Sequence, residues 1–144
     1  MKFYCGNITP APENIFVFGS NPQGRHGAGA AKVARLHFGA IYGQGEGLQC
    51  NAYAIPTKDL RVSVNNGYRS IPPATITKSI RKMYDCARNH PQRRFMVAYR
   101  NTHVRSLNGY TGIEMIQMFI AAGPIPDNVW FSEEWRQTGL FGIE

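Results

Sequence analysis

Cysteine is scarce and irregularly placed in this chain of 144 residues. The three cysteines, Cys5, Cys50 and Cys86, lie far apart and form no C-x-x-C pair. An odd number without paired spacing predicts neither a disulfide framework nor a structural zinc site. The four histidines are equally scattered, and no two have the spacing that places metal ligands on one helix. We therefore expect no bound metal and a reducing, cytoplasmic setting.

Long apolar runs are also missing. No run approaches the ~18 residues that a membrane-spanning helix needs. The opening stretch MKFYCGNITPAPEN has neither the apolar core nor the small-residue cleavage site of a secretory signal. The length suits one domain, and no linker, repeat or low-complexity segment divides the chain. We expect a single soluble domain over residues 1–144 that does not contact a membrane.

Acidic residues are few, since 9 Asp and Glu stand against 16 Lys and Arg, which gives a net charge of +7. The excess is concentrated between residues 58 and 105, where eleven Lys or Arg accompany two acids, a local charge of +9. Such a bias favours an anionic partner, either a nucleic-acid backbone or a small molecule with a diphosphate. The alternative is a solvated basic face that only aids solubility.

Strand and helix patterns alternate along the sequence. Short apolar runs bounded by Gly or Pro predict strands at residues 14–18, 53–56, 95–99 and 128–131. Apolar residues at helical spacing predict helices at residues 28–38, 74–90 and 113–120, and residues 59–73 are expected to be a loop. Alternation of this kind predicts an α/β fold with a mostly parallel sheet that carries helices on both faces.

Eight of the fifteen glycines lie between Gly19 and Gly47, and the first group follows a predicted strand in the stretch GSNPQGRHGAG. Glycine lets backbone amides approach an anion closely, and a helix that begins near Ala28 would add its positive end. The pattern is neither a P-loop, since no GK[ST] ends it, nor a complete GxGxxG motif. A glycine-rich turn without a ligand is the competing interpretation.

Polar residues follow the predicted strands, where ligands bind in parallel sheets. Asn21 can reach a sugar hydroxyl or a base edge, or it can simply open a turn before proline. Arg25 and His26 can contact phosphate or substrate, or serve solubility alone. Lys58 follows the apolar run YAIP. There it can act as a nucleophile toward the anomeric carbon of a ribose, as a phosphate-binding charge, or as an ordinary surface lysine.

Several motifs together resemble the macrodomain superfamily of ADP-ribose binders. The resemblance spans nearly the whole chain and rests on FGSN, GRHGAGAA, FGAIYGQGEG, YAIPTKD, SLNGYTGIEMIQMF and NVWFSEEW. It is similar in particular to small bacterial and phage members, and to the branch of DNA and glutamate ADP-ribose hydrolases that use a lysine. The resemblance implies a three-layer α/β/α sandwich with a mixed, mostly parallel sheet, and no cofactor.

The same resemblance assigns roles to individual residues. Asn21 falls at the position that binds near the distal ribose, and Lys58 at the position of the catalytic lysine. A second phosphate loop falls on SLNGY. The residues expected to bind the ligand are Gly19, Ser20, Asn21, Arg25, His26, Gly27, Ala28, Gly29, Ser106, Leu107, Gly109 and Tyr110, and the two expected catalytic positions are Lys58 and Asn108.

Two departures from the family pattern affect the predicted function. Arg105 and Ser106 replace glycines of the second phosphate loop, and Asn108 stands where the lysine-using hydrolases have Asp. The missing carboxylate removes an acid or base that typically contributes about 10²–10⁴-fold. Three functions therefore stay open: an enzyme that removes ADP-ribose from a modified macromolecule, a module that binds ADP-ribose or a related nucleotide without chemistry, and a nucleic-acid binder that uses the basic segment 58–105.

Overall fold

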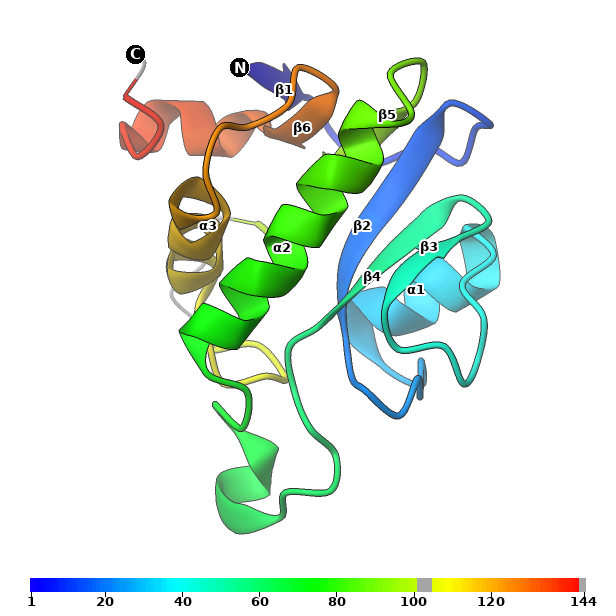
Figure 1. Cartoon of the computed structure of the whole chain (residues 1–144), viewed down its shortest axis with the longest axis vertical. Coiled ribbons are helices and arrows are strands. Elements are labelled where there is room, and N and C mark those ends of the chain that lie inside the picture. Colours follow the sequence, from blue (N-terminus) through cyan, green and yellow to red (C-terminus); the bar gives the residue numbers. More distant parts are fainter. Residues whose placement is uncertain (101–104, 143–144) are drawn as a thin grey trace.

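The computed structural model describes residues 1–100 and 105–142, in which six strands form one sheet (Figure 1). The strand order is β1-β6-β5-β2-β4-β3. All neighbouring strands pair in parallel except β3, which runs antiparallel to β4. The protein is thus α/β with a mixed, mostly parallel sheet, as the sequence predicts. The strands are β1 (Lys2–Tyr4), β2 (Asn14–Ser20), β3 (Gly47–Gln49), β4 (Ala52–Pro56), β5 (Arg94–Val97) and β6 (Val129–Ser132).

The described residues also form three α-helices and two short 3₁₀ turns. The helices are α1 (Gly29–His37), α2 (Pro73–Arg88) and α3 (Gly112–Ala121), and the 3₁₀ turns are η1 (Val64–Gly67) and η2 (Glu133–Thr138). The predicted strands and helices are confirmed to within a few residues at their ends. Strands β1 and β3 were not predicted, because each has three residues and exists only through pairing with β6 or β4. Among the described residues, no helix has the length and apolarity to cross a membrane.

Strand β2 lies inside the sheet and sends alternate side chains to two separate apolar clusters. Ile15 and Val17 join the larger cluster, to which α2 and α3 contribute. Phe16 and Phe18 join a smaller cluster with residues of α1 and with Phe38, whose ring stacks on that of Phe16 at 4.5 Å. The alternation follows from the two-residue period of a strand, so β2 anchors α1 separately from α2 and α3.

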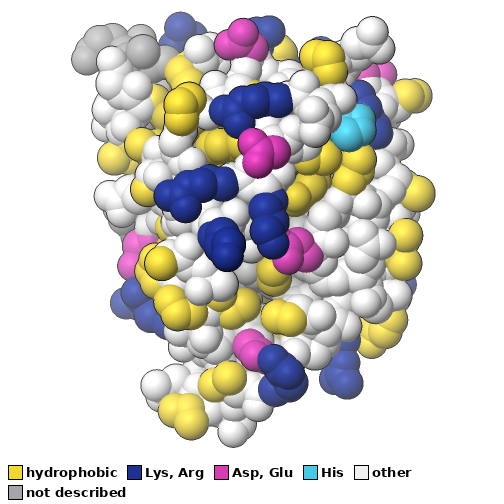
Figure 2. Space-filling view, in the orientation of Figure 1, with side chains coloured by type: hydrophobic (Ala, Val, Ile, Leu, Met, Phe, Trp, Pro, Cys, Tyr) yellow, Lys and Arg dark blue, Asp and Glu magenta, His cyan; other side chains and the backbone are white. Residues whose placement is uncertain are grey.

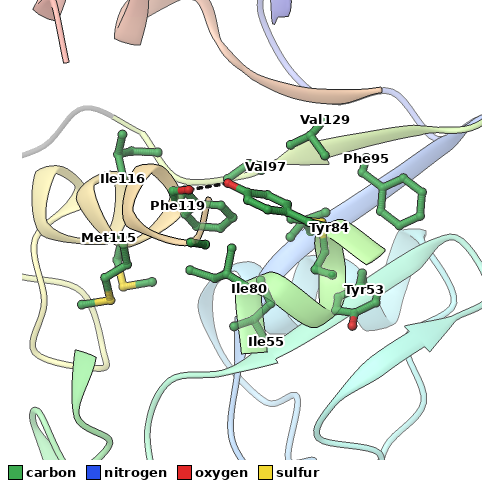
Figure 3. Close-up of a cluster of buried hydrophobic side chains, with 14 of the residues drawn as sticks. Tyr53, Ile55, Ile80, Tyr84, Phe95, Val97, Met115, Ile116, Phe119 and Val129 are labelled. Atoms are coloured by element: carbon green, nitrogen blue, oxygen red, sulfur yellow. Dashed lines mark hydrogen bonds between the residues drawn. The ribbon is translucent and has the colours of Figure 1, made fainter. Parts of the chain in front are cut away.

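Helix α2 buries one apolar stripe in the larger cluster. Ile76, Ile80 and Met83 follow helical spacing and are fully buried. The Tyr84 hydroxyl donates to the backbone oxygen of Phe119 at 2.5 Å and ties α2 to α3 (Figure 3). Burial raises the pKa of Tyr84, so its phenol stays a neutral donor. The contact satisfies a polar group that would otherwise be costly inside the core.

The parallel pairing places the carboxyl ends of three central strands next to one another. In the register, Ser20 of β2 lies beside Pro56 of β4, and Val17 of β2 lies beside Val97 of β5. The loops that follow β2, β4 and β5 therefore begin at the same edge of the sheet. These are the loops that carry most of the predicted site residues.

Candidate functional site

A cavity of about 640 Å³ lies beyond the carboxyl ends of β2, β4 and β5. Its walls come from the loop after β2, the first turn of α1, the residues after β4 and β5, and the loop before α3. Of the predicted site residues, all except His26, Gly109 and Tyr110 line this cavity. The fold thus gathers residues 19–29, Lys58 and residues 106–108 around one space.

The loop after β2 is held closed by the side chain of Asn21. Its Nδ2 donates to the Arg25 carbonyl oxygen and its Oδ1 accepts from the Arg25 backbone N–H, both at 2.8 Å. The backbone N–H of Gly24 closes the same turn on the Asn21 carbonyl oxygen at 2.9 Å. Asn21 is buried and acts as a turn residue, the alternative that the sequence left open. The Asn21 amide therefore fixes the backbone of the loop that forms this wall of the cavity.

The first turn of α1 faces the cavity without a capping group. Ala28, at the N-cap, offers no side-chain hydrogen bond, and the first turn holds no acidic residue. Gly29, Ala30 and Ala31 all line the cavity. The first N–H groups of a helix lack intrahelical partners and carry the positive end of its dipole. This end of α1 therefore presents free donors to an anion.

Gly29 begins α1 in the left-handed region, with φ +58°. Side chains rarely adopt this conformation, so the backbone itself favours glycine there. A Cβ on Gly29 would lie 3.4 Å from Cδ1 of Leu107, which belongs to the loop before α3. Leu107, 55% exposed, thus stands opposite the first turn of α1, and the two loops face each other across the cavity.

The loop before α3 is organised by Asn108. Its Oδ1 accepts from the Ser106 hydroxyl at 2.5 Å and from the Tyr110 backbone N–H at 2.9 Å. Its Nδ2 contacts the Met115 sulfur at 3.7 Å, and the whole residue is only 5% exposed. Asn108 borders the cavity, but its amide is engaged inside the loop. It offers no acid or base to a ligand.

Three predicted residues point elsewhere. The His26 ring is fully buried, lies edge-on to Phe18 at 5.3 Å, and has its Nε2 3.0 Å from the backbone oxygen of Gln44. Tyr110 is buried and its hydroxyl donates to the Ile71 carbonyl oxygen at 2.7 Å. Gly109 packs against Tyr68, from which an added Cβ would be 2.7 Å away. These three residues do not line the cavity; their contacts hold the surrounding loops.

The cavity has a positive lining. Arg25, Lys58 and Arg105 line it, and no carboxylate belongs to its described lining. The Lys58 Nζ lies 5.4 Å from the centre of the Tyr68 ring, a cation–π contact. Arg105 donates from Nη1 to the Gly109 carbonyl oxygen at 2.8 Å, and the same atom is 3.9 Å from a carboxylate oxygen of Glu114. Positive charge together with free N–H groups suits an anionic ligand.

Most cations of the basic segment 58–105 lie near carboxylates in the fold. Seven of its eleven cations lie 2.8 to 3.9 Å from a carboxylate oxygen, namely Arg61, Arg69, Lys82, Arg88, Arg94, Arg100 and Arg105. On the face in Figure 2, Lys and Arg side chains are interspersed with Asp and Glu. Arg81 and Arg93 donate to backbone oxygens instead. Lys58 is the segment's cavity residue that has no ion pair among the described residues.

Several lining residues were missed by the sequence reasoning. Thr57 directly follows strand β4 and Tyr99 lies two residues after strand β5, and the lining also includes Leu60, Ala30, Ala31 and Arg105. The rule that ligands bind beyond the ends of parallel strands applied equally to Thr57 and Tyr99. Thr57 lies within the motif YAIPTKD, so that motif could also have pointed to it, whereas Tyr99 belongs to no recognised motif and only the positional rule pointed to it.

Metal-binding clusters are not found in the part of the chain that the structure describes. No three His, Cys, Asp or Glu side chains within residues 1–100 and 105–142 come close enough together to hold an ion. Cys5, Cys50 and Cys86 are all free, and Cys86 is the most buried of them. His103, the fourth histidine, lies outside the described residues.

Comparison with protein-family models gives no match for this chain, and comparison with curated proteins gives no significant match either. The function is therefore inferred from the geometry of the cavity together with the motif resemblance.

Proposed function

We propose that the protein binds ADP-ribose, or a related nucleotide, in the cavity beyond β2, β4 and β5. One observation carries the proposal: the uncapped first turn of α1 and three cations face the same space, whose described lining has no carboxylate. The volume of about 640 Å³ lies within the range of about 300–1,000 Å³ that is usual for ligand pockets. The proposal includes the three-layer α/β/α arrangement, which the two clusters flanking β2 support.

The diphosphate is placed between the first turn of α1 and the loop of residues 105–109. Backbone N–H groups of Gly29, Ala30 and Ala31 supply donors on one side, and Arg105 supplies positive charge on the other. A helix N-terminus contributes about 0.3–1 kcal/mol to an exposed anion and up to about 2 kcal/mol when partly buried. Because several such donors act together, micromolar affinity is within reach.

Calorimetric titration with ADP-ribose tests the proposal, with AMP and ribose 5-phosphate as comparisons. We expect a micromolar dissociation constant, about −8 kcal/mol, and weaker binding of both comparison ligands. Gly29→Glu is expected to abolish binding, since its carboxylate would enter the phosphate position. Gly29→Ala has the same left-handed backbone strain without the charge and should retain most of the affinity. Absence of heat with the unaltered chain at millimolar ligand would overturn the proposal.

Release of ADP-ribose from a modified macromolecule is a second candidate activity, and the position of Lys58 favours it. Lys58 lines the cavity and forms no ion pair with a described carboxylate. In this reaction the Lys58 amine attacks the anomeric carbon of the distal ribose while the bond from that carbon to the macromolecule breaks and the leaving atom takes up a proton; water then displaces the lysine and releases ADP-ribose. The engaged amide of Asn108 favours binding without chemistry. Lys58→Ala and Lys58→Arg are both expected to stop turnover of an ADP-ribosylated substrate, whereas full turnover by Lys58→Ala would exclude the mechanism.

A further inference from the structure

The hydroxyl of Tyr99 is a buried polar group at the inner wall of the cavity, and it has no hydrogen-bond partner among the described residues. Tyr99 follows β5, and its oxygen lies against Gly19 at the end of β2. A Cβ on Gly19 would be 2.3 Å from the Tyr99 oxygen and 3.1 Å from Oγ1 of Thr57. The phenol therefore occupies space that only a glycine at position 19 leaves free.

Three buried tyrosines of the chain, Tyr4, Tyr84 and Tyr110, have their hydroxyls paired. The hydroxyls of Tyr4, Tyr84 and Tyr110 donate to backbone oxygens of Val97, Phe119 and Ile71 at 2.5 to 2.7 Å. An unpaired buried hydroxyl has a real desolvation cost, and most buried polar atoms in folded proteins avoid it. The exception at Tyr99 therefore requires an explanation.

The location distinguishes Tyr99 from the remaining unpaired polar atoms. Among the described residues these atoms are His26 Nδ1, Glu46 Oε2, Arg93 Nε and Trp130 Nε1, and none of the four residues lines this cavity. Tyr99 alone combines an unpaired donor with a place in the cavity wall. The unpaired donor and the proposed ligand site thus coincide.

The chemistry of this wall suits an oxygen acceptor. Burial raises the pKa of Tyr99 and the nearby Thr57 hydroxyl lowers it by less, so the phenol keeps its proton and can donate. The neighbouring Thr57 hydroxyl makes only a long 3.4 Å bond to the Ser20 carbonyl oxygen. That long bond is weak, so it holds the Thr57 hydroxyl only loosely near the phenol.

We infer that Tyr99 determines ligand specificity: its hydroxyl donates a hydrogen bond to an oxygen of the bound ligand, a ribose hydroxyl or a phosphate oxygen, at the inner end of the cavity. This inference rests on the proposed function and adds to it a contact that none of the recognised motifs contains. A site with a buried donor of this kind discriminates against ligands that lack the matching acceptor, since the donor would then remain unpaired.

Tyr99→Phe tests the inference through two separate measurements. Removal of an unpaired hydroxyl should leave the melting temperature unchanged or raise it, because no bond within the folded chain is lost. The affinity for ADP-ribose, measured by calorimetry, should fall about 10-fold or more because the ligand oxygen loses its donor. If Tyr99→Phe melts at the same temperature and binds ADP-ribose more weakly, the Tyr99 hydroxyl bonds to the ligand and not to the folded chain.

Tyr84→Phe is the matched control. Its hydroxyl bonds to the Phe119 oxygen in the core between α2 and α3 (Figure 3), and neither residue lines the cavity. This variant should melt at a lower temperature and bind ADP-ribose as the unaltered chain does. The two variants are thus expected to behave in opposite ways.

The possible outcomes separate the two proposals. A lower melting temperature for Tyr99→Phe overturns the inference, because the hydroxyl would then be bonded within the chain. Unchanged affinity in Tyr99→Phe, with binding by the unaltered chain, overturns this inference alone. Failure of the unaltered chain to bind ADP-ribose overturns the proposed function and this contact together.

Discussion

At the scale of single residues, amide side chains hold the two cavity loops in shape. Asn21 closes the loop after β2, and Asn108 closes the loop before α3. Both are buried, and both use their oxygen on backbone N–H groups of their own loop. A polar side chain beside a ligand cavity can therefore act through the backbone that it fixes.

Asn108→Ala should show this positioning role. Loss of the bonds from Ser106 and Tyr110 is expected to lower the free energy of unfolding by about 1–3 kcal/mol and to weaken ADP-ribose binding, since the loop loses its shape. Urea titration and calorimetry measure the two effects. Asn128→Ala is a suitable control, because its Nδ2 donates to three backbone oxygens outside the cavity lining and its loss should affect stability alone. Unchanged stability in Asn108→Ala would contradict the role.

Gly19 and Tyr99 should be energetically coupled. A Cβ on Gly19 would meet the Tyr99 oxygen at 2.3 Å, so Gly19→Ala is expected to cost about 1–3 kcal/mol through overpacking. In the Tyr99→Phe background the clashing oxygen is absent, and the same substitution should cost at least about 0.5 kcal/mol less. A double-mutant cycle by urea denaturation measures the difference. If the stability costs of the two substitutions simply add, the Tyr99 oxygen does not lie against Gly19.

At the scale of elements, α1 and α3 begin in opposite ways. Thr111 and Glu114 form a capping box that satisfies the first turn of α3 from within the chain. Helix α1 begins after Ala28 with no capping side chain and no acid in its first turn. Because free N–H groups favour an anion, the contrast indicates that α1, not α3, presents its N-terminus to a ligand.

The capping box of α3 makes stability depend on pH in a defined direction. The hydrogen bond from the Thr111 backbone N–H, assisted by Arg69, lowers the pKa of Glu114 in the folded chain. The stabilisation is therefore complete at neutral pH and is lost as the pH falls through the lowered pKa. Glu114→Gln should lower the free energy of unfolding at pH 7 by about 0.5–1 kcal/mol, a small effect because the carboxylate is partly exposed.

Urea titrations at several pH values check this expectation. The difference between Glu114→Gln and the unaltered chain should shrink in acid, below the ordinary glutamate pKa of about 4.3. Thr111→Ala removes the other half of the box, and its cost should vary little with pH because the hydroxyl does not titrate. A difference for Glu114→Gln that is constant from neutral to acid pH would refute the assignment.

At the scale of the whole molecule, the basic segment does not form one continuous positive surface. Seven of its eleven cations pair with carboxylates. Of the others, Lys58 lines the cavity and Lys78 lies on α2. We therefore expect only weak binding of single-stranded nucleic acid, with a slope of log affinity against log salt no steeper than about −1.5, equivalent to roughly two phosphates. Fluorescence anisotropy over a salt series measures it, and a slope steeper than about −5 would favour a nucleic-acid function.

Much of the fold could be predicted because its signals are local. The apolar run of β2 and the helical spacing of Ile76, Ile80 and Met83 each come from a single element that packs on the core. Strands β1 and β3 could not be predicted in the same way. A strand of three residues is too short to show an alternating pattern, and its pairing with another strand decides whether it forms.

The sequence by itself determined the alternation of strands and helices and the placement of a glycine-rich turn, Asn21 and Lys58 at strand ends, because these depend on neighbouring residues. Only the tertiary structure decided that His26 and Tyr110 are buried outside the cavity lining and that seven cations of the basic segment lie near carboxylates. It also decided that the Tyr99 hydroxyl is left unpaired beside Gly19. The reason is physical: a side chain's partners are set by residues far along the chain, which meet only when the sheet is assembled.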